Sequence, residues 1–192
     1  VCGDDNQGLS GLEYSYDSDN YSHLIGIKDA FGYQNKMEYD YRFNTLLKTT
    51  DRNDQSTIYS LDANGRISSI RGPYEIAAGK PYTIAYEYFP NAKVPYARTR
   101  NYDSELDKDI ETYTYTDGLE RAIQVKKTAS LFTQVGSPDQ EAQIVSGKVI
   151  YDGLGRPVAS YYPTTTTTID NNFSTAVSAV APTKTEYDEV GR

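Results

Sequence analysis

The chain has 192 residues, of which 38% are hydrophobic and 12% are aromatic, with 19 tyrosines, five phenylalanines and no tryptophan. Its formal net charge of −8 argues against a nucleic acid partner, because binding to a phosphate backbone normally requires a basic patch. The sequence contains no run of about 18 apolar residues that could cross a membrane, and its single cysteine, Cys2, excludes an internal disulfide.

Tyrosine is by far the most abundant aromatic residue, and it must do much of the packing that leucine and isoleucine do elsewhere. Its ring buries well, but its hydroxyl needs a hydrogen-bond partner or water. Thin β-layers with one wet face provide both, and tyrosine and threonine are enriched in strands. The composition therefore predicts an all-β fold.

An Asp-x-x-Gly-Arg pattern recurs along the chain at uneven intervals. Its weakest copy comes first, at Tyr39-Asp40-Tyr41-Arg42-Phe43-Asn44, with Tyr16-Asp17 as a further candidate before it. The later copies are Leu61-Asp62-Ala63-Asn64-Gly65-Arg66, Thr116-Asp117-Gly118-Leu119-Glu120-Arg121 with Glu120 in the glycine position, Tyr151-Asp152-Gly153-Leu154-Gly155-Arg156 and Tyr187-Asp188-Glu189-Val190-Gly191-Arg192.

Each copy is interpreted as the turn of a β-hairpin. The aspartate side chain can accept hydrogen bonds from backbone N–H groups two residues on, and glycine adopts the left-handed conformation that closes such loops. A β-branched residue at Gly155 should therefore destabilise the fold. The residues assigned to these structural turns are Asp62, Gly65, Arg66, Asp117, Arg121, Tyr151, Asp152, Gly155, Arg156, Tyr187, Asp188, Gly191 and Arg192.

Between the turns, period-two alternation predicts strands over 82–88, 111–116 and 121–127. In the last of these, Ile123 and Val125 face away from Ala122, Gln124 and Lys126. No segment of eleven or more residues has a clear helical period, so helix should be scarce. Prolines punctuate three stretches that are predicted to be long loops, at 91–106, 130–143 and 164–182.

The repeated Tyr-Asp-x-x-Gly-Arg motif resembles the Rhs/YD-repeat family, and especially the shell-forming region of bacterial insecticidal toxin complex (Tc) proteins. Other stretches similar to that subgroup are Arg71-Gly72-Pro73-Tyr74-Glu75, Arg98-Thr99-Arg100-Asn101-Tyr102-Asp103 and Val145-Ser146-Gly147-Lys148-Val149. The resemblance implies an array of antiparallel β-hairpins that forms a curved or spiralling sheet. Residues 1–192 would be a single YD-repeat array and a fragment of a longer chain.

The resemblance also implies a structural role without catalysis, in a shell that encloses a toxic C-terminal polypeptide for secretion or delivery. The expected partners are the remainder of the shell and that polypeptide, with carbohydrate as a further candidate and neither nucleic acid nor direct membrane insertion. No cofactor or metal is expected. The protein should be secreted or lie at the bacterial cell surface, with any export signal outside this fragment. A cell-surface adhesion or carbohydrate-binding module built from the same repeats is the alternative.

The sequence gives weaker signals for a catalytic or metal-binding site. The only histidine, His23, has no second histidine or nearby cysteine with which to form a triad or zinc site. Carboxylates at Asp4-Asp5, Asp17 to Asp19 and 103–111 leave open an acid/base pair for polysaccharide breakdown, a third interpretation. Asp17-Ser18-Asp19-Asn20 has oxygen ligands for calcium but lacks the glycine and final glutamate of an EF-hand loop.

Overall fold

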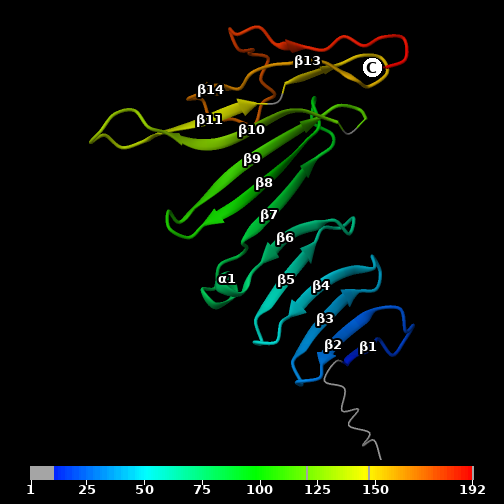
Figure 1. The fold of residues 1–192 in the computed structure, drawn as a ribbon. Helices are drawn as coiled ribbons and strands as arrows, with labels where there is room; N and C mark the ends of the chain where they lie inside the picture. Colours follow the sequence, from blue (N-terminus) through cyan, green and yellow to red (C-terminus); the bar gives the residue numbers. More distant parts are fainter. Residues whose placement is uncertain (1–10, 120, 147, 192) are drawn as a thin grey trace, which may run out of the picture. The chain divides into compact units, whose positions relative to one another are not determined.

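The computed structural model describes residues 11–119, 121–146 and 148–191 (Figure 1). Cys2, Asp4, Asp5, Glu120 and Arg192 therefore lie outside the described residues. The prediction of an all-β fold made of antiparallel hairpins with little helix is confirmed. The described helix, α1 (Pro73–Ala77), has five residues and begins with a proline, which suits the first helical turn.

The hydrogen-bonded strands form two sheets. The larger is an open antiparallel sheet of 12 strands in the order β1-β2-β3-β4-β5-β6-β7-β8-β9-β10-β11-β14, and the smaller has the order β12-β13-β15. By its internal contacts the chain divides into two compact units, Val1–Ala85 and Tyr86–Arg192. That all 192 residues act as a single array stays a prediction.

The first unit is a meander in which each strand pairs with the next one in the chain (Figure 1). The register shifts between Ser15 and Tyr16, between Glu38 and Tyr39, and between Ser60 and Leu61, one residue before the aspartate of a motif copy in each case. Such bulges bend a strand and increase its twist. The strands are β1 (Leu12–Tyr16), β2 (Leu24–Asp29), β3 (Gln34–Asp40), β4 (Thr45–Thr50), β5 (Ser56–Leu61), β6 (Ile67–Arg71) and the start of β7 (Ile84–Phe89).

The second unit continues the antiparallel pairing from β8 to β11 and then β14, and it also holds the three-stranded sheet. Register shifts next to the motif occur here too, between Ala122 and Gln124 and between Ile150 and Tyr151. The strands are β8 (Tyr96–Asp103), β9 (Lys108–Thr116), β10 (Ala122–Leu131), β11 (Gln140–Ser146), β12 (Val149–Tyr151), β13 (Pro157–Ser160), β14 (Thr164–Thr166) and β15 (Thr183–Lys184).

The predicted long loop at 91–106 is wrong, because Tyr96–Asp103 forms β8 and pairs along its whole length with β9. Its alternation is carried by arginines that pair with carboxylates on the neighbouring strands, so an apolar period is missing. The predicted loop at 130–143 is shorter than expected, since β10 reaches Leu131 and β11 begins at Gln140. In 164–182 only Thr164–Thr166 forms a strand.

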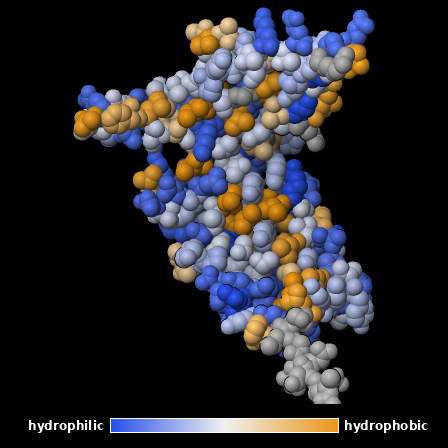
Figure 2. Space-filling model, in the orientation of Figure 1, coloured by the Kyte–Doolittle hydropathy of each residue, from blue (hydrophilic) through white to orange (hydrophobic). Residues whose placement is uncertain are grey.

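The best-buried side chains of the second unit lie on β9, β10 and β11. They include Tyr113, Tyr115, Ala142 and Val145, but also the polar residues Gln124, Lys126 and Gln143. The face drawn in Figure 2 carries its hydrophobic residues in separate groups among hydrophilic ones. Among the described residues there is no helix that is long and apolar enough to cross a membrane.

Candidate functional site

The motif copy at 152–156 forms a closed turn. The N–H of Asp152 donates to the carbonyl of Arg156 at 2.9 Å, and the N–H of Gly155 donates to the carbonyl of Asp152 at 3.0 Å. The Asp152 carboxylate accepts the N–H groups of Leu154 and Arg156, both at 2.9 Å, and the Arg156 Nε at 2.7 Å. Aspartate and arginine of one copy are therefore bonded to each other and to the turn backbone.

The three bonds to the aspartate carboxylate recur in the copies at 62–66 and 117–121. In the copy that begins at Asp188, the carboxylate accepts the N–H of Val190 at 3.0 Å. The motif glycines Gly65, Gly155 and Gly191 have φ of +80°, +80° and +83°, a region that side-chain-bearing residues rarely adopt. In these three copies the left-handed glycine and the accepting aspartate together close the turn.

Ionisation of the aspartates is favoured by these bonds. The pKa of Asp117 is lowered, chiefly by the hydrogen bond from the Arg121 side chain. The pKa of Asp152 is lowered too, chiefly by the backbone N–H of Arg156. Both carboxylates are thus charged acceptors at neutral pH.

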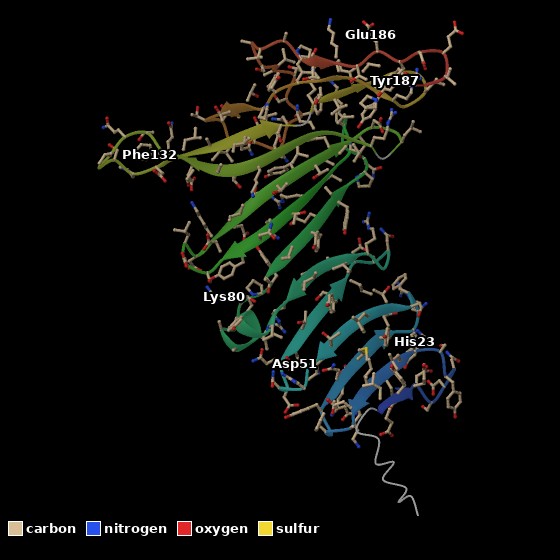
Figure 3. The ribbon with its side chains drawn as sticks, in the orientation of Figure 1. His23, Asp51, Lys80, Phe132, Glu186 and Tyr187 are labelled. Atoms are coloured by element: carbon tan, nitrogen blue, oxygen red, sulfur yellow. The ribbon has the colours of Figure 1, made fainter. Side chains whose placement is uncertain are left out.

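Two motif arginines of the second unit, Arg121 and Arg156, also contact the following copy. The Arg121 guanidinium lies 4.2 Å from the centre of the Tyr151 ring, and the Arg156 guanidinium lies 4.4 Å from that of Tyr187, which is labelled in Figure 3. A Cβ placed on Gly155 would lie only 2.8 Å from the Arg121 Nη1. The motif therefore links successive turns, because the arginine of one copy covers the tyrosine and glycine of the next.

In the first unit other side chains occupy the place of the arginine. The Phe43 ring lies so close to Gly65 that a Cβ there would overlap it. One turn earlier, the His23 ring lies 4.9 Å from Tyr39 and 5.0 Å from Tyr41, and its Nε2 is hydrogen-bonded to the Asn44 side chain (Figure 3). The degenerate copy at 39–44 is thus part of a stack formed by 17–23, 40–44 and 62–66.

Two turns of the same construction escaped the sequence reasoning, at Asp29 and Asp51. The Asp29 carboxylate accepts the N–H groups of Phe31 and Tyr33 at 2.9 Å. Asp51, labelled in Figure 3, does the same for Asn53 and Gln55, and its pKa is lowered chiefly by the Gln55 N–H. Residues 29–32 have the Asp-x-x-Gly spacing without the arginine. A search for that shorter pattern would have predicted the turn at Asp29.

In the segment Asp17–Asn20, considered above as a calcium site, the Asp17 carboxylate binds the backbone of its own turn. Asp17 is 3% exposed, and its carboxylate accepts backbone N–H groups from Asn20, Ser22 and His23 at 2.8, 2.9 and 2.6 Å. These bonds, the one from His23 most of all, lower its pKa to about 2. The carboxylate therefore caps a turn, and the described ranges contain no group of three or more potential metal-ligating side chains.

Two of the carboxylates at 103–111 form ion pairs between β9 and β8. Glu111 lies 3.6 Å from an Arg98 nitrogen, and Asp109 lies 3.6 Å from an Arg100 nitrogen. The same two arginines bind Glu87 of β7. Each of these carboxylates faces an arginine, whereas glycoside hydrolysis requires two carboxyl groups that flank a substrate.

Fold and turns together define a β-hairpin repeat protein in which successive turns are linked by the motif itself. Residues 88–192, more than half of the chain, match the family described as "Domain of unknown function (DUF6443)". The chain belongs to this family. No curated protein matches it.

Several solved structures have the same fold. A crystal structure of TcdB2-TccC3 is 23% identical, with a TM-score of 0.66 over 83% of this chain and 10% of that one. A TcdB2-TccC3 structure without its hypervariable C-terminal region is 18% identical, with a TM-score of 0.72 over 96% and 14%. A Photorhabdus luminescens Tc holotoxin pore is 17% identical, with a TM-score of 0.67 over 83% and 12%. The resemblance to Tc proteins is thereby confirmed in the fold, and the chain spans a small part of their length.

Proposed function

We propose that this chain is a non-catalytic structural segment of an Rhs/YD-repeat shell that encapsulates a toxic polypeptide for secretion or delivery. The observation that supports this proposal most strongly is that the repeated residues bond to one another and to the next copy of the motif. Asp117 and Arg121 bond to each other, and the arginine covers Tyr151 and Gly155 of the next copy. The motif side chains that recur once per hairpin therefore hold the fold together. This is the role expected of repeated residues in a structural shell.

The linkage is directional, and this supports a role in an extended array. Arg121 contacts the copy after it, and Arg156 in turn contacts Tyr187 of the copy after that. Repeat proteins gain stability from such nearest-neighbour interfaces, so copies can be added without redesign. The partners on this proposal are the remainder of the shell and an enclosed C-terminal polypeptide, and the protein acts outside the bacterial cytoplasm or at the cell surface.

Protease protection in the longer protein that this proposal requires provides the test. We expect its segment C-terminal to the repeats to resist a protease under native conditions. It should become sensitive in the Gly155→Val variant, which disrupts the linked turns, but not in Gly153→Val, since a Cβ at Gly153 would meet nothing within 4 Å. Digestion of the C-terminal segment in the unmodified protein as fast as in the Gly155→Val variant would exclude encapsulation.

A second function is favoured by exposed tyrosines in the first unit. Tyr14 and Tyr16 lie two residues apart on β1 and are 52% and 50% exposed. Aromatic rings displayed on one face of a strand can stack on sugar rings. If the chain is a carbohydrate-binding module, glycan-array binding should be lost in Tyr14→Ala/Tyr16→Ala and retained in Tyr74→Ala, an isolated exposed tyrosine on α1.

A further inference from the structure

Residues 170–174 form neither strand nor helix, and they lie over β9, β10 and β11 in the manner of a bound extended peptide. Within the second unit, its contacts reach side chains of the sheet that are 27 to 58 residues away in sequence. The arrangement is separate from the linked turns and does not depend on the function proposed above.

Two glutamines of the sheet bind the backbone of the segment. Gln143 donates its Nε2 to the carbonyl of Asp170 at 2.9 Å and accepts the Asp170 N–H at 3.2 Å. Gln124 makes the same pair of bonds with Ser174, at 2.9 and 2.8 Å. An amide that both donates to and accepts from one residue imitates a neighbouring strand, and it recognises the backbone whatever side chain is present.

Two further sheet residues contact side chains of the segment. Lys126, whose side chain is 3% exposed, donates to the Asp170 carboxylate at 2.5 Å and to the carbonyls of Asp170 and Asn172 at 3.0 and 3.2 Å. The Phe173 ring lies edge-on to Tyr115, with ring centres 5.6 Å apart. The contacts select a carboxylate and, three residues later, an aromatic ring.

The face of β9, β10 and β11 that carries Tyr115, Gln124, Lys126 and Gln143 differs from an ordinary hydrophobic core because three of these four buried side chains are polar. Burial of a polar side chain is costly unless it is hydrogen-bonded, and here Gln124, Lys126 and Gln143 obtain their bonds from one short segment. When the segment leaves, these three side chains can form hydrogen bonds with water instead of staying buried without partners. The face is thus built to bind a peptide and to tolerate its departure.

We propose that this face is a peptide-recognition site, whose resident occupant is the chain's own segment 170–174. In trans it accepts an extended segment of another polypeptide with the pattern Asp-x-x-Phe. The resident segment competes at a high effective concentration because it is tethered, so an external peptide binds well only when the resident one is removed or released.

The test begins with a variant in which the resident segment is replaced by Gly-Ser-Gly-Ser-Gly, and with a labelled peptide of the sequence of residues 168–176. We expect saturable binding to this emptied variant and at least tenfold weaker binding to the unmodified chain. Peptides with asparagine in place of Asp170 or alanine in place of Phe173 should bind at least tenfold more weakly. A peptide with alanine in place of Ser174 should bind like the parent peptide, because only the Ser174 backbone contacts Gln124.

The absence of saturable binding to an emptied variant with native circular dichroism would overturn the proposal, and so would equal affinity for the parent and asparagine peptides. If the emptied variant does not fold, protease sites are placed in 167–169 and 175–180, which form no strand, and the folded protein is cut there. The labelled peptide should then exchange with the released segment, and Gln143→Ala should prevent its retention. No exchange, or retention unaffected by Gln143→Ala, contradicts the site.

Discussion

Replacement of Gly155 by alanine tests whether the turns are linked as the structure shows. Gly155 has φ of +80°, and left-handed backbone costs an alanine roughly 1–2 kcal/mol. The new Cβ would also lie 2.8 Å from the Arg121 Nη1, so the guanidinium must move away from its position over Tyr151. Loss of a partly exposed cation–π contact adds roughly 0.5–1 kcal/mol, for a total of about 2 kcal/mol.

Two other glycines of the second unit separate these contributions. Gly136 has φ of +84° but no atom within 4 Å of its Cβ position, so Gly136→Ala reports the backbone cost alone. Gly153 also has open space at that position and is not among the positive-φ residues, so Gly153→Ala should leave stability almost unchanged. The difference between Gly155→Ala and Gly136→Ala measures the contact with Arg121.

The assay is urea unfolding of the 192-residue chain, followed by far-ultraviolet circular dichroism and by tyrosine absorbance. We expect the loss of unfolding free energy to increase from Gly153→Ala through Gly136→Ala to Gly155→Ala. A loss for Gly155→Ala no greater than that for Gly136→Ala would show that the arginine does not restrain the following turn. The reasoning that links one motif copy to the next would then be refuted.

The remaining predictions concern single side chains. Tyr115→Phe should raise the unfolding free energy by about 1 kcal/mol in urea unfolding, because the Tyr115 hydroxyl is buried without a hydrogen-bond partner among the described residues; a loss would contradict this. Asp17→Asn should lower the melting temperature at neutral pH. Since the Asp17 pKa is lowered from 3.8 to about 2, its stabilisation is present above pH 3.8 and disappears as the pH falls toward 2, so the two melting curves should converge there; a constant gap would oppose that reasoning. Arg156→Lys keeps the charge but loses the Nε bond to Asp152 and the planar contact with Tyr187, so its melting temperature should fall; an unchanged value would count against both contacts.

The fold class could be predicted because its signals are local. Alternation in 111–116 and 121–127 has the period of a strand, and β9 and β10 lie there. The Asp-x-x-Gly-Arg spacing likewise specifies bonds that all lie within five residues, as the bonds of Asp152 illustrate. Such features need no knowledge of what packs against them.

Features that depend on distant residues could not be predicted. The contact between Arg121 and the turn of Gly155 joins two copies whose separation in space is set by the sheet, not by the spacing of the motif. β8 was missed for a related reason. Arg98 and Arg100 occupy alternate positions on it, and they are half-buried because Glu87 of β7 and Glu111 of β9 pair with them.

Strand β10 shows why alternation alone does not locate a core. Its period separates Ile123 and Val125 from Gln124 and Lys126, and hydrophobicity would assign the first pair to the interior. The structure buries the second pair, because the segment 170–174 supplies backbone and carboxylate groups that satisfy it. A buried polar face therefore implies a polar occupant, and here that occupant comes from the threonine- and asparagine-rich stretch, where strand signals are weakest.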